Sequence, residues 1–292
     1  MEKIFFLLMA LYLSPGLLAQ TNEPYEIYNY LQVGDTIVLS NGGHIRSTPS
    51  RNGKSIDQLP IGSVLYINED GDYHGVGSKV IYNLKTGYYS VRYEKSGEWK
   101  TGYVWGGLIA SSYFIDKNKN QFLFGRRSFN TEEYELTYAV IRIDGESKKV
   151  HEQSFSYPLG DQSSFESKVL GNMGLSNLQQ LFRVGFLGEA CGVYTTYHYY
   201  GWNGSEFIEL PTKNSMGDAG VFGYSENLLF PTEHKLGKDF IIIESTTTNI
   251  DYVQYKELEG KEFEVEETVK ETKVYHWNGK KATLLEPLPV NY

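Results

Sequence analysis

Hydrophobic and polar residues alternate over much of the chain, and short apolar runs lie between turn signals. Residues 89–93 and 101–105 alternate between two faces, whereas Val64–Ile67 is an apolar run that follows a Pro-x-Gly turn. Ser96-Gly97, between the two alternating stretches, predicts a hairpin turn because glycine accepts a positive φ at little cost. The 24 tyrosines and 15 phenylalanines also favour strands. We therefore predict an all-β protein.

One pattern occurs three times in the second half of the chain. The clearest copies are residues 197–211 and 274–289, each with an aromatic strand, a Trp-Asn-Gly turn, a second strand and a proline. Residues 138–158 form a looser copy with a turn at Asp144-Gly145. Asn-Gly favours a type I′ hairpin, since that turn needs a positive φ twice. We predict an antiparallel β domain of about three meander units, arranged like propeller blades, as a sandwich or as one large curved sheet. The resemblance to propeller blades implies no site residues.

Polar residues mark a junction between two domains at Ser111-Ser112 and Asp116–Asn120. The only candidate helix after this point is residues 163–181, whose internal glycines disfavour it. The predicted organisation is a signal peptide at 1–19, a lead-in at 20–41, a small barrel at 42–111 and the C-terminal β domain at 112–292.

The N-terminus has the pattern of a secretory signal peptide. Lys3 provides a positive charge, and Ile4–Leu13 is an apolar stretch too short to span a bilayer. We predict cleavage after Ala19 and a periplasmic or secreted protein. No other stretch approaches the ~20 apolar residues that a membrane helix needs, so we expect no integral membrane segment after cleavage. Cys191 is the only cysteine, which rules out an internal disulfide.

Three short motifs follow one another between residues 42 and 110. The opening motif is Arg46 with Pro49-Ser50, the turn motif is Leu59, Pro60 and Gly62, and the closing motif is Tyr89, Val91, Gly97, Gly102, Tyr103 and Val104. In this order they resemble the bacterial SH3 domain family, a small β-barrel module of exported and envelope proteins. The resemblance implies an SH3-like barrel that binds a ligand and carries no catalytic residues.

Charge and motif spacing exclude several other functions. The net charge of −9 gives no electrostatic footprint for nucleic acid. The six histidines form no HExxH motif and no pair at metal-ligand spacing, and no Gly-x-Ser-x-Gly is present. A strand-like sequence follows Cys191, so we expect a small buried side chain there and not a nucleophile. We therefore predict no catalytic residue, no metal and no cofactor.

Aromatic residues of the barrel are the candidate ligand-binding residues: Tyr73, Tyr88, Trp99, Tyr103 and Trp105. Alternation places Tyr103 and Trp105 on one face and Val104 on the other. Exposed aromatic rings suit glycan or peptide ligands. The alternative for each of them is a place in the core.

These observations predict an exported, non-enzymatic binding protein that recognises cell-wall peptidoglycan or an envelope protein. One alternative is a cell-envelope hydrolase with an active site on the C-terminal sheet, for which carboxylates such as Glu189, Asp218 and Asp239 would have to meet. Another is an accessory subunit of an envelope complex that pairs through exposed strand edges.

Overall fold

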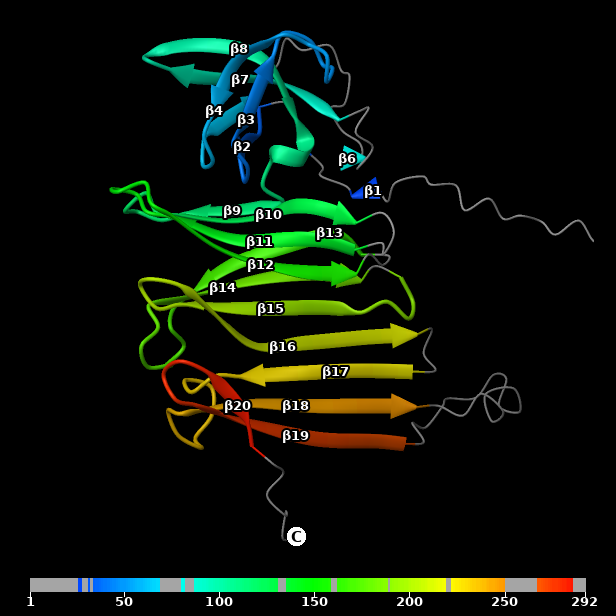
Figure 1. The fold of residues 1–292 in the computed structure, drawn as a ribbon. Coiled ribbons are helices and arrows are strands. Elements are labelled where there is room, and N and C mark those ends of the chain that lie inside the picture. Colours follow the sequence, from blue (N-terminus) through cyan, green and yellow to red (C-terminus); the bar gives the residue numbers. More distant parts are fainter. Residues whose placement is uncertain are drawn as a thin grey trace, which may run out of the picture.

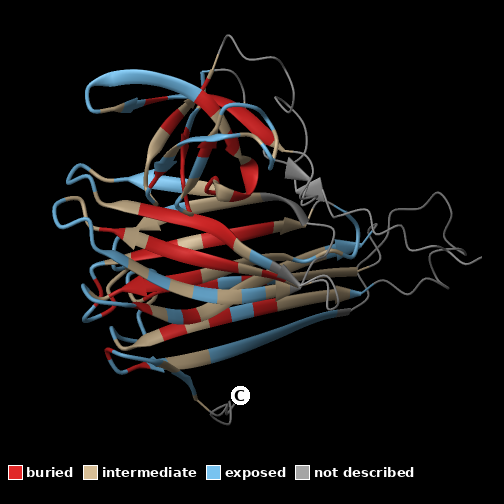
Figure 2. Cartoon of the chain, turned by 45° about the horizontal axis from the view of Figure 1, so that its top comes forward, coloured by how far each residue is buried: buried red, intermediate tan, exposed pale blue. Residues whose placement is uncertain are grey.

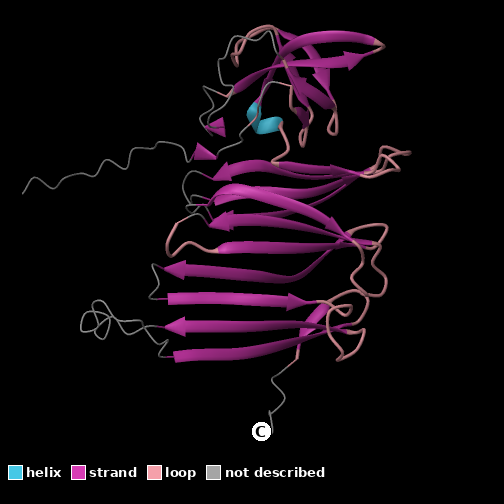
Figure 3. Cartoon of the chain, turned by 180° about the vertical axis from the view of Figure 1, so that it is seen from behind, coloured by secondary structure: helices cyan, strands magenta, loops and turns pink. Residues whose placement is uncertain are grey.

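The chain folds into antiparallel sheets, as expected for an all-β protein. The computed structural model describes residues 26–27, 31, 34–68, 80–81, 87–130, 135–158, 162–188, 190–218, 222–249 and 267–285. Within these residues the only helical element is a single 3₁₀ turn, η1 (Gly106–Leu108), and no helix is long and apolar enough to cross a membrane (Figure 3). A short pair, β1 (Glu26–Ile27) with β6 (Val80–Ile81), accompanies three larger sheets. The predicted signal peptide lies outside the described residues.

The N-terminal sheet lies above the other two sheets in Figure 1, and its strand order is β2-β5-β7-β8-β3-β4. Its strands are β2 (Thr36–Val38), β3 (Gly43–Arg46), β4 (Ser55–Leu59), β5 (Val64–Ile67), β7 (Tyr88–Lys95) and β8 (Glu98–Trp105). All six strands place side chains in one buried cluster, which includes Ile37, Ile45, Leu59, Leu65 and Val104. The sheet must therefore curve around this core.

The N-terminal sheet differs from the predicted barrel in two respects. No ladder joins the outer strands β2 and β4, so the described strands form an open curved sheet and not a closed barrel. The sheet also includes β2, which lies in the segment expected to be a lead-in. The hairpin between β7 and β8 turns as predicted, with Ser96 at φ 56° and Gly97 at φ 82°.

The second sheet contains β9 (Ser112–Ile115), β10 (Gln121–Asn130), β11 (Glu135–Ile143) and β12 (Val150–Pro158) in sequence order. Residues 116–120 are the β9–β10 hairpin turn, so the expected polar junction at this place is wrong. The Asp116 carboxylate closes the turn by accepting hydrogen bonds from the backbone N–H groups of Asn118 at 2.8 Å and Asn120 at 2.9 Å.

The third sheet is an eight-stranded meander in sequence order. Its strands are β13 (Gln162–Leu170), β14 (Gln180–Gly188), β15 (Thr195–Trp202), β16 (Phe207–Asp218), β17 (Phe222–Leu229), β18 (Phe240–Asn249), β19 (Glu267–Trp277) and β20 (Ala282–Leu284). The candidate helix at 163–181 is instead a strand, a loop over 171–179 and the start of β14.

The second sheet packs face to face against the first strands of the third sheet, β13 to β16, as in a sandwich, and buried residues gather there (Figure 2). A shared core joins Phe122, Phe124 and Tyr138 of the second sheet to Phe182 and Phe186 of β14. Alternate residues of β14 and β15 point the other way, where Leu181 and Tyr199 join a core covered by Leu175 and Leu178 of the 171–179 loop. The two continuous sheets exclude a ring of separate propeller blades over these residues.

The N-terminal sheet packs against the second sheet through an apolar cluster that includes Val38, Ala110, Leu123 and Ile141. A β-bulge on β10 places Arg127 at this contact. Its guanidinium donates to the Ser40 carbonyl at 2.6 Å and to the Asn41 side chain, and binds both carboxylate oxygens of Glu152 at 2.7 Å. The N-terminal sheet is therefore fixed to the rest of the molecule by both packing and a charged contact.

Candidate functional site

The five predicted aromatic residues do not all lie on one surface. Tyr73 lies outside the described residues. Tyr88 is buried with 6% of its surface exposed, and Trp99 is 60% exposed. Tyr103 and Trp105 are half-buried on one face of β8 while Val104 is buried on the other, which confirms the predicted alternation. Trp99 is therefore the most accessible of these residues that the structure describes.

Cross-strand pairing places Trp99 among particular neighbours on the outer face of the N-terminal sheet. In the β7–β8 ladder, Glu94 pairs with Trp99, Arg92 with Thr101 and Ser90 with Tyr103, while in the β5–β7 ladder Tyr66 pairs with Arg92. Residues directly opposite each other in an antiparallel pair share a face. We call the surface formed by Tyr66, Ser90, Arg92, Trp99, Thr101 and Tyr103 the outer strip.

At one end of the outer strip, two aromatic rings hold a guanidinium group. The ring centroids of Tyr66 and Trp99 are 5.7 Å apart with a 58° angle between the planes. The Arg92 guanidinium carbon lies 5.7 Å from the centroid of Tyr66 and 5.5 Å from that of Trp99. Cation–π attraction at these distances orients the arginine and keeps its charge beside two flat apolar rings. Such a surface offers stacking area and a cationic hydrogen-bond donor together.

The outer strip continues into an open pocket of about 480 Å³ that is bordered by β4, β7 and β8 and by residues just after β3 and β5. The pocket is lined by Ser47, Ile56, Asn68, Ser90, Thr101 and Tyr103. Gly102 lets β8 lie close to the core here, because a Cβ at this position would collide with the Ile45 side chain. Hydroxyl groups, an amide and a tyrosine ring line one concave surface, which suits a ligand with both polar groups and flat apolar faces.

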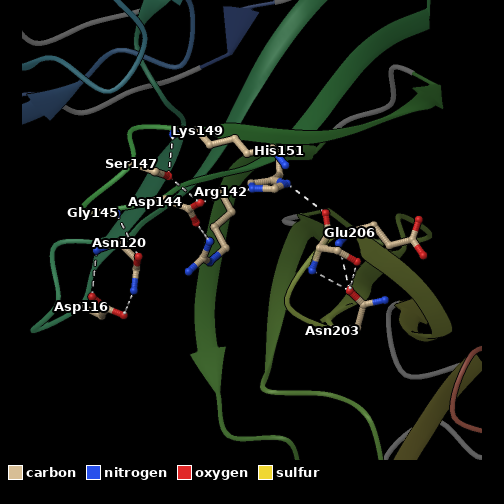
Figure 4. Close-up of polar contacts among 11 residues, drawn as sticks. Asp116, Asn120, Arg142, Asp144, Gly145, Ser147, Lys149, His151, Asn203 and Glu206 are labelled. Atoms are coloured by element: carbon tan, nitrogen blue, oxygen red, sulfur yellow. Dashed lines mark hydrogen bonds and ion pairs between the residues drawn. The ribbon is translucent and has the colours of Figure 1, made fainter.

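A second polar cluster joins the tips of three hairpins at the other sheets (Figure 4). The backbone N–H of Gly145 donates to the Asn120 side chain at 2.9 Å, which links the β9–β10 and β11–β12 hairpins. Asp144 binds Arg142, and its second carboxylate oxygen lies 3.5 Å from Nε2 of His151. Nδ1 of His151 lies 2.9 Å from the carbonyl oxygen of Ser205, in the β15–β16 hairpin.

A histidine beside a carboxylate could act as a general base, but the geometry here favours a structural role. Nδ1 of His151 is directed at the Ser205 carbonyl and Nε2 at Asp144, so neither nitrogen is directed at open solvent. The Arg142 guanidinium carbon lies 4.6 Å from the ring centroid of Trp202, and burial lowers the pKa of Arg142 and of His151. The cluster holds hairpin tips together and presents no free acid–base pair.

The remaining candidates for chemistry also stay apart. Cys191 is exposed in the β14–β15 turn, where Gly192 has φ 74°, so the expected buried position is wrong. Gly188 and Gly192, which flank Cys191 in the sequence, are the residues that could have predicted that turn. Asp218 ends β16 and Asp239 precedes β18, which places them at opposite ends of the sheet. Glu189, the third candidate carboxylate, lies outside the described residues. The described residues contain no group of three or more His, Cys, Asp or Glu side chains that could hold a metal ion.

Sequence reasoning missed Tyr66 and Arg92. Arg92 lies on the outward face of a strand that the alternation predicted, since its neighbour Val91 is buried. Tyr66 lies in the apolar run 64–67, which was expected to be a buried strand and instead alternates between half-buried and buried positions. What the alternation could not supply is the register that brings them beside Trp99. The comparisons with known proteins give no further assignment, because no protein family, no curated protein and no solved structure matches this chain.

Proposed function

We propose that the protein is an exported, non-enzymatic binding protein that recognises cell-wall peptidoglycan through the outer strip. The observation that carries this proposal is the exposed Trp99, held beside Tyr66 and Arg92 on the same face as Ser90, Thr101 and Tyr103, which line a polar pocket. The signal-peptide pattern supports export, and the resemblance to bacterial SH3 domains supports a binding function at the cell envelope.

The chemistry of the outer strip matches the chemistry of peptidoglycan. Sugar rings present apolar C–H faces that stack on aromatic rings, and the stem peptides carry carboxylates that an arginine can bind. Hydroxyl groups in the pocket can accept and donate hydrogen bonds to sugar hydroxyls and to peptide amides. The net charge of −9 makes bulk attraction to an anionic polymer unfavourable, so recognition depends on local contacts.

The test is co-sedimentation of the purified exported protein with insoluble peptidoglycan. Saturable retention is expected for the natural protein, and Trp99→Ala should weaken binding by about tenfold or more, because exposed tryptophans dominate such contacts. Phe114→Ala is the matched control: Phe114 is an aromatic residue on β9 that is 42% exposed and lies outside the outer strip. Both variants should unfold at the temperature of the natural protein.

An envelope protein is the other partner that the same surface could bind. If the natural protein is not retained on peptidoglycan, the proposal fails. Crosslinking in intact cells from a photoreactive residue at position 99 would then identify a protein partner. Equal loss of binding in Trp99→Ala and Phe114→Ala would also contradict a specific role for the outer strip.

A further inference from the structure

The loop over 171–179 is held between two hairpin turns with the same sequence, Trp-Asn-Gly. Trp277 donates from Nε1 to the carbonyl oxygen of Ser176 at 3.0 Å. On the other side, the backbone N–H of Gln179 donates to the carbonyl oxygen of Trp202 at 2.8 Å. Both tryptophans are buried with 1% of their surface exposed. The repeated motif therefore fixes one loop from two sides.

The glycine of each turn makes room for an amide side chain of the loop. A Cβ on Gly279 would lie 2.5 Å from Nδ2 of Asn177, and one on Gly204 would lie 2.8 Å from Nε2 of Gln179. Asn177 is exposed yet has φ 60°, a conformation that asparagine tolerates better than most residues. Two exposed amide groups thus lie against glycines, in positions set by the fold.

These groups surround an open pocket of about 470 Å³, a size typical of small-ligand sites. It is lined by Asn177, Leu178, Gln179, Asn203, Ser205 and Lys280 together with Gly279. Asn203 uses its Oδ1 to accept hydrogen bonds from its own turn, at 2.8 Å from the N–H of Ser205 and 2.9 Å from that of Glu206. Its amide nitrogen remains as a donor (Figure 4).

The chemistry of the lining favours a hydroxyl-rich ligand with a negative charge. The amides of Asn177 and Gln179 can donate and accept hydrogen bonds, and the Asn203 amide can donate. The Ser205 hydroxyl donates to Oδ1 of Asn203 at 2.9 Å and can accept. This mixture of donors and acceptors matches sugar hydroxyls. Lys280 is exposed and adds one positive charge, and none of the described lining residues carries a carboxylate. An acidic peptide would need more cations and fewer amides. The whole protein has a net charge of −9, whereas the described lining of this pocket has one lysine and no carboxylate. The pocket is therefore a more favourable place for an anion than the average surface of the protein.

We propose that this pocket binds an acidic saccharide, with the amides of Asn177 and Gln179 on its hydroxyl groups and Lys280 on its carboxylate. The site lies between the 171–179 loop and two hairpin turns of the third sheet, and it shares no residue with the outer strip. The two proposals therefore fail or succeed independently.

The test uses trigalacturonate as the probe, titrated into the full-length exported protein at low ionic strength and followed by NMR or calorimetry. Lys280→Ala should weaken binding by about tenfold, since a charge-assisted hydrogen bond is lost. Asn177→Gly should have a similar effect, because glycine keeps the left-handed backbone and removes only the amide. Lys281→Ala, the adjacent exposed lysine outside the pocket, should leave binding within about twofold, as should Trp99→Ala.

Maltotriose, a neutral trisaccharide, should bind at least about tenfold more weakly than trigalacturonate. Equal affinity for the two would overturn the assignment of an anion. Equal or tighter binding of triglutamate would overturn the assignment of a saccharide. Absence of trigalacturonate binding, or binding unchanged by both pocket variants, would overturn the site itself.

Discussion

His198 should make the sandwich core sensitive to acid. Its ring lies among aromatic side chains of both sheets, with centroids 5.1 Å from Phe155, 5.8 Å from Tyr157 and 5.7 Å from Phe186. Neither ring nitrogen has a hydrogen-bond partner among the described residues. Burial in these surroundings disfavours the charged form and lowers the pKa of His198 from 6.5 to about 4.

The direction of the effect follows from which state binds the proton. Between pH 6.5 and about 4, the histidine of the unfolded chain takes up a proton while the folded one does not. Acid therefore stabilises the unfolded state, and the contribution to stability is complete above pH 6.5 and lost as the pH falls towards 4. At about 1.4 kcal/mol for each unit of pKa, the loss amounts to about 3 kcal/mol.

His198→Phe removes this proton uptake and replaces the imidazole by a ring of similar shape. Urea unfolding of both proteins at pH 7, 5.5 and 4 measures the difference between their free energies of unfolding. We expect the variant to gain about 3 kcal/mol on the natural protein between pH 7 and pH 4. Tyr200→Phe is the control, because burial raises the pKa of Tyr200 and its hydroxyl does not titrate in this range. A difference for His198→Phe that stays constant with pH would refute the reasoning.

Three further predictions concern stability. Arg127→Ala should cost about 2–4 kcal/mol in chemical denaturation, because its carboxylate partner on β12 and two acceptors in the loop between β2 and β3 lose their donor. A cost below about 0.5 kcal/mol would contradict the contact. Trp277→Ala should cost about 3–5 kcal/mol and speed proteolysis of the loop that it anchors, and unchanged cleavage there would contradict the anchor. Gly102→Ala should cost about 1–3 kcal/mol by overpacking the core. Gly97→Ala has open space around it and should cost only about 1 kcal/mol of backbone strain. Equal shifts of the unfolding temperature in the two variants would contradict this difference.

Local patterns in the sequence predicted what depends on local physics. The all-β class, the hairpins at Gly97, Gly145, Gly204 and Gly279, and the opposite faces of Tyr103 and Val104 follow from alternation and turn residues alone. The prediction of a type I′ turn at the two Asn-Gly sites was wrong, since Asn203 and Asn278 do not have the positive φ that this turn needs. Each asparagine side chain instead accepts two backbone N–H bonds and closes a four-residue loop.

Features that depend on distant contacts could not be predicted in this way. The packing of β10 and β11 on β14 and β15 requires knowing which apolar faces meet, and three arrangements fitted the same strands. The outer strip depends on the register between β5, β7 and β8, which brings Arg92 between Tyr66 and Trp99. The orientation of Arg127 depends on a bulge that no residue pattern announces.

Oxidative labelling of tryptophan tests the role of the outer strip most directly. Trp99 is 60% exposed, whereas Trp202 and Trp277 are 1% exposed and provide unreactive internal references. The protein is labelled with and without saturating soluble peptidoglycan fragments, and each tryptophan is quantified by mass spectrometry. Recognition through the outer strip predicts protection of Trp99 by the fragments and no change at the buried pair. Bound protein in which Trp99 remains as reactive as in the free protein would contradict it.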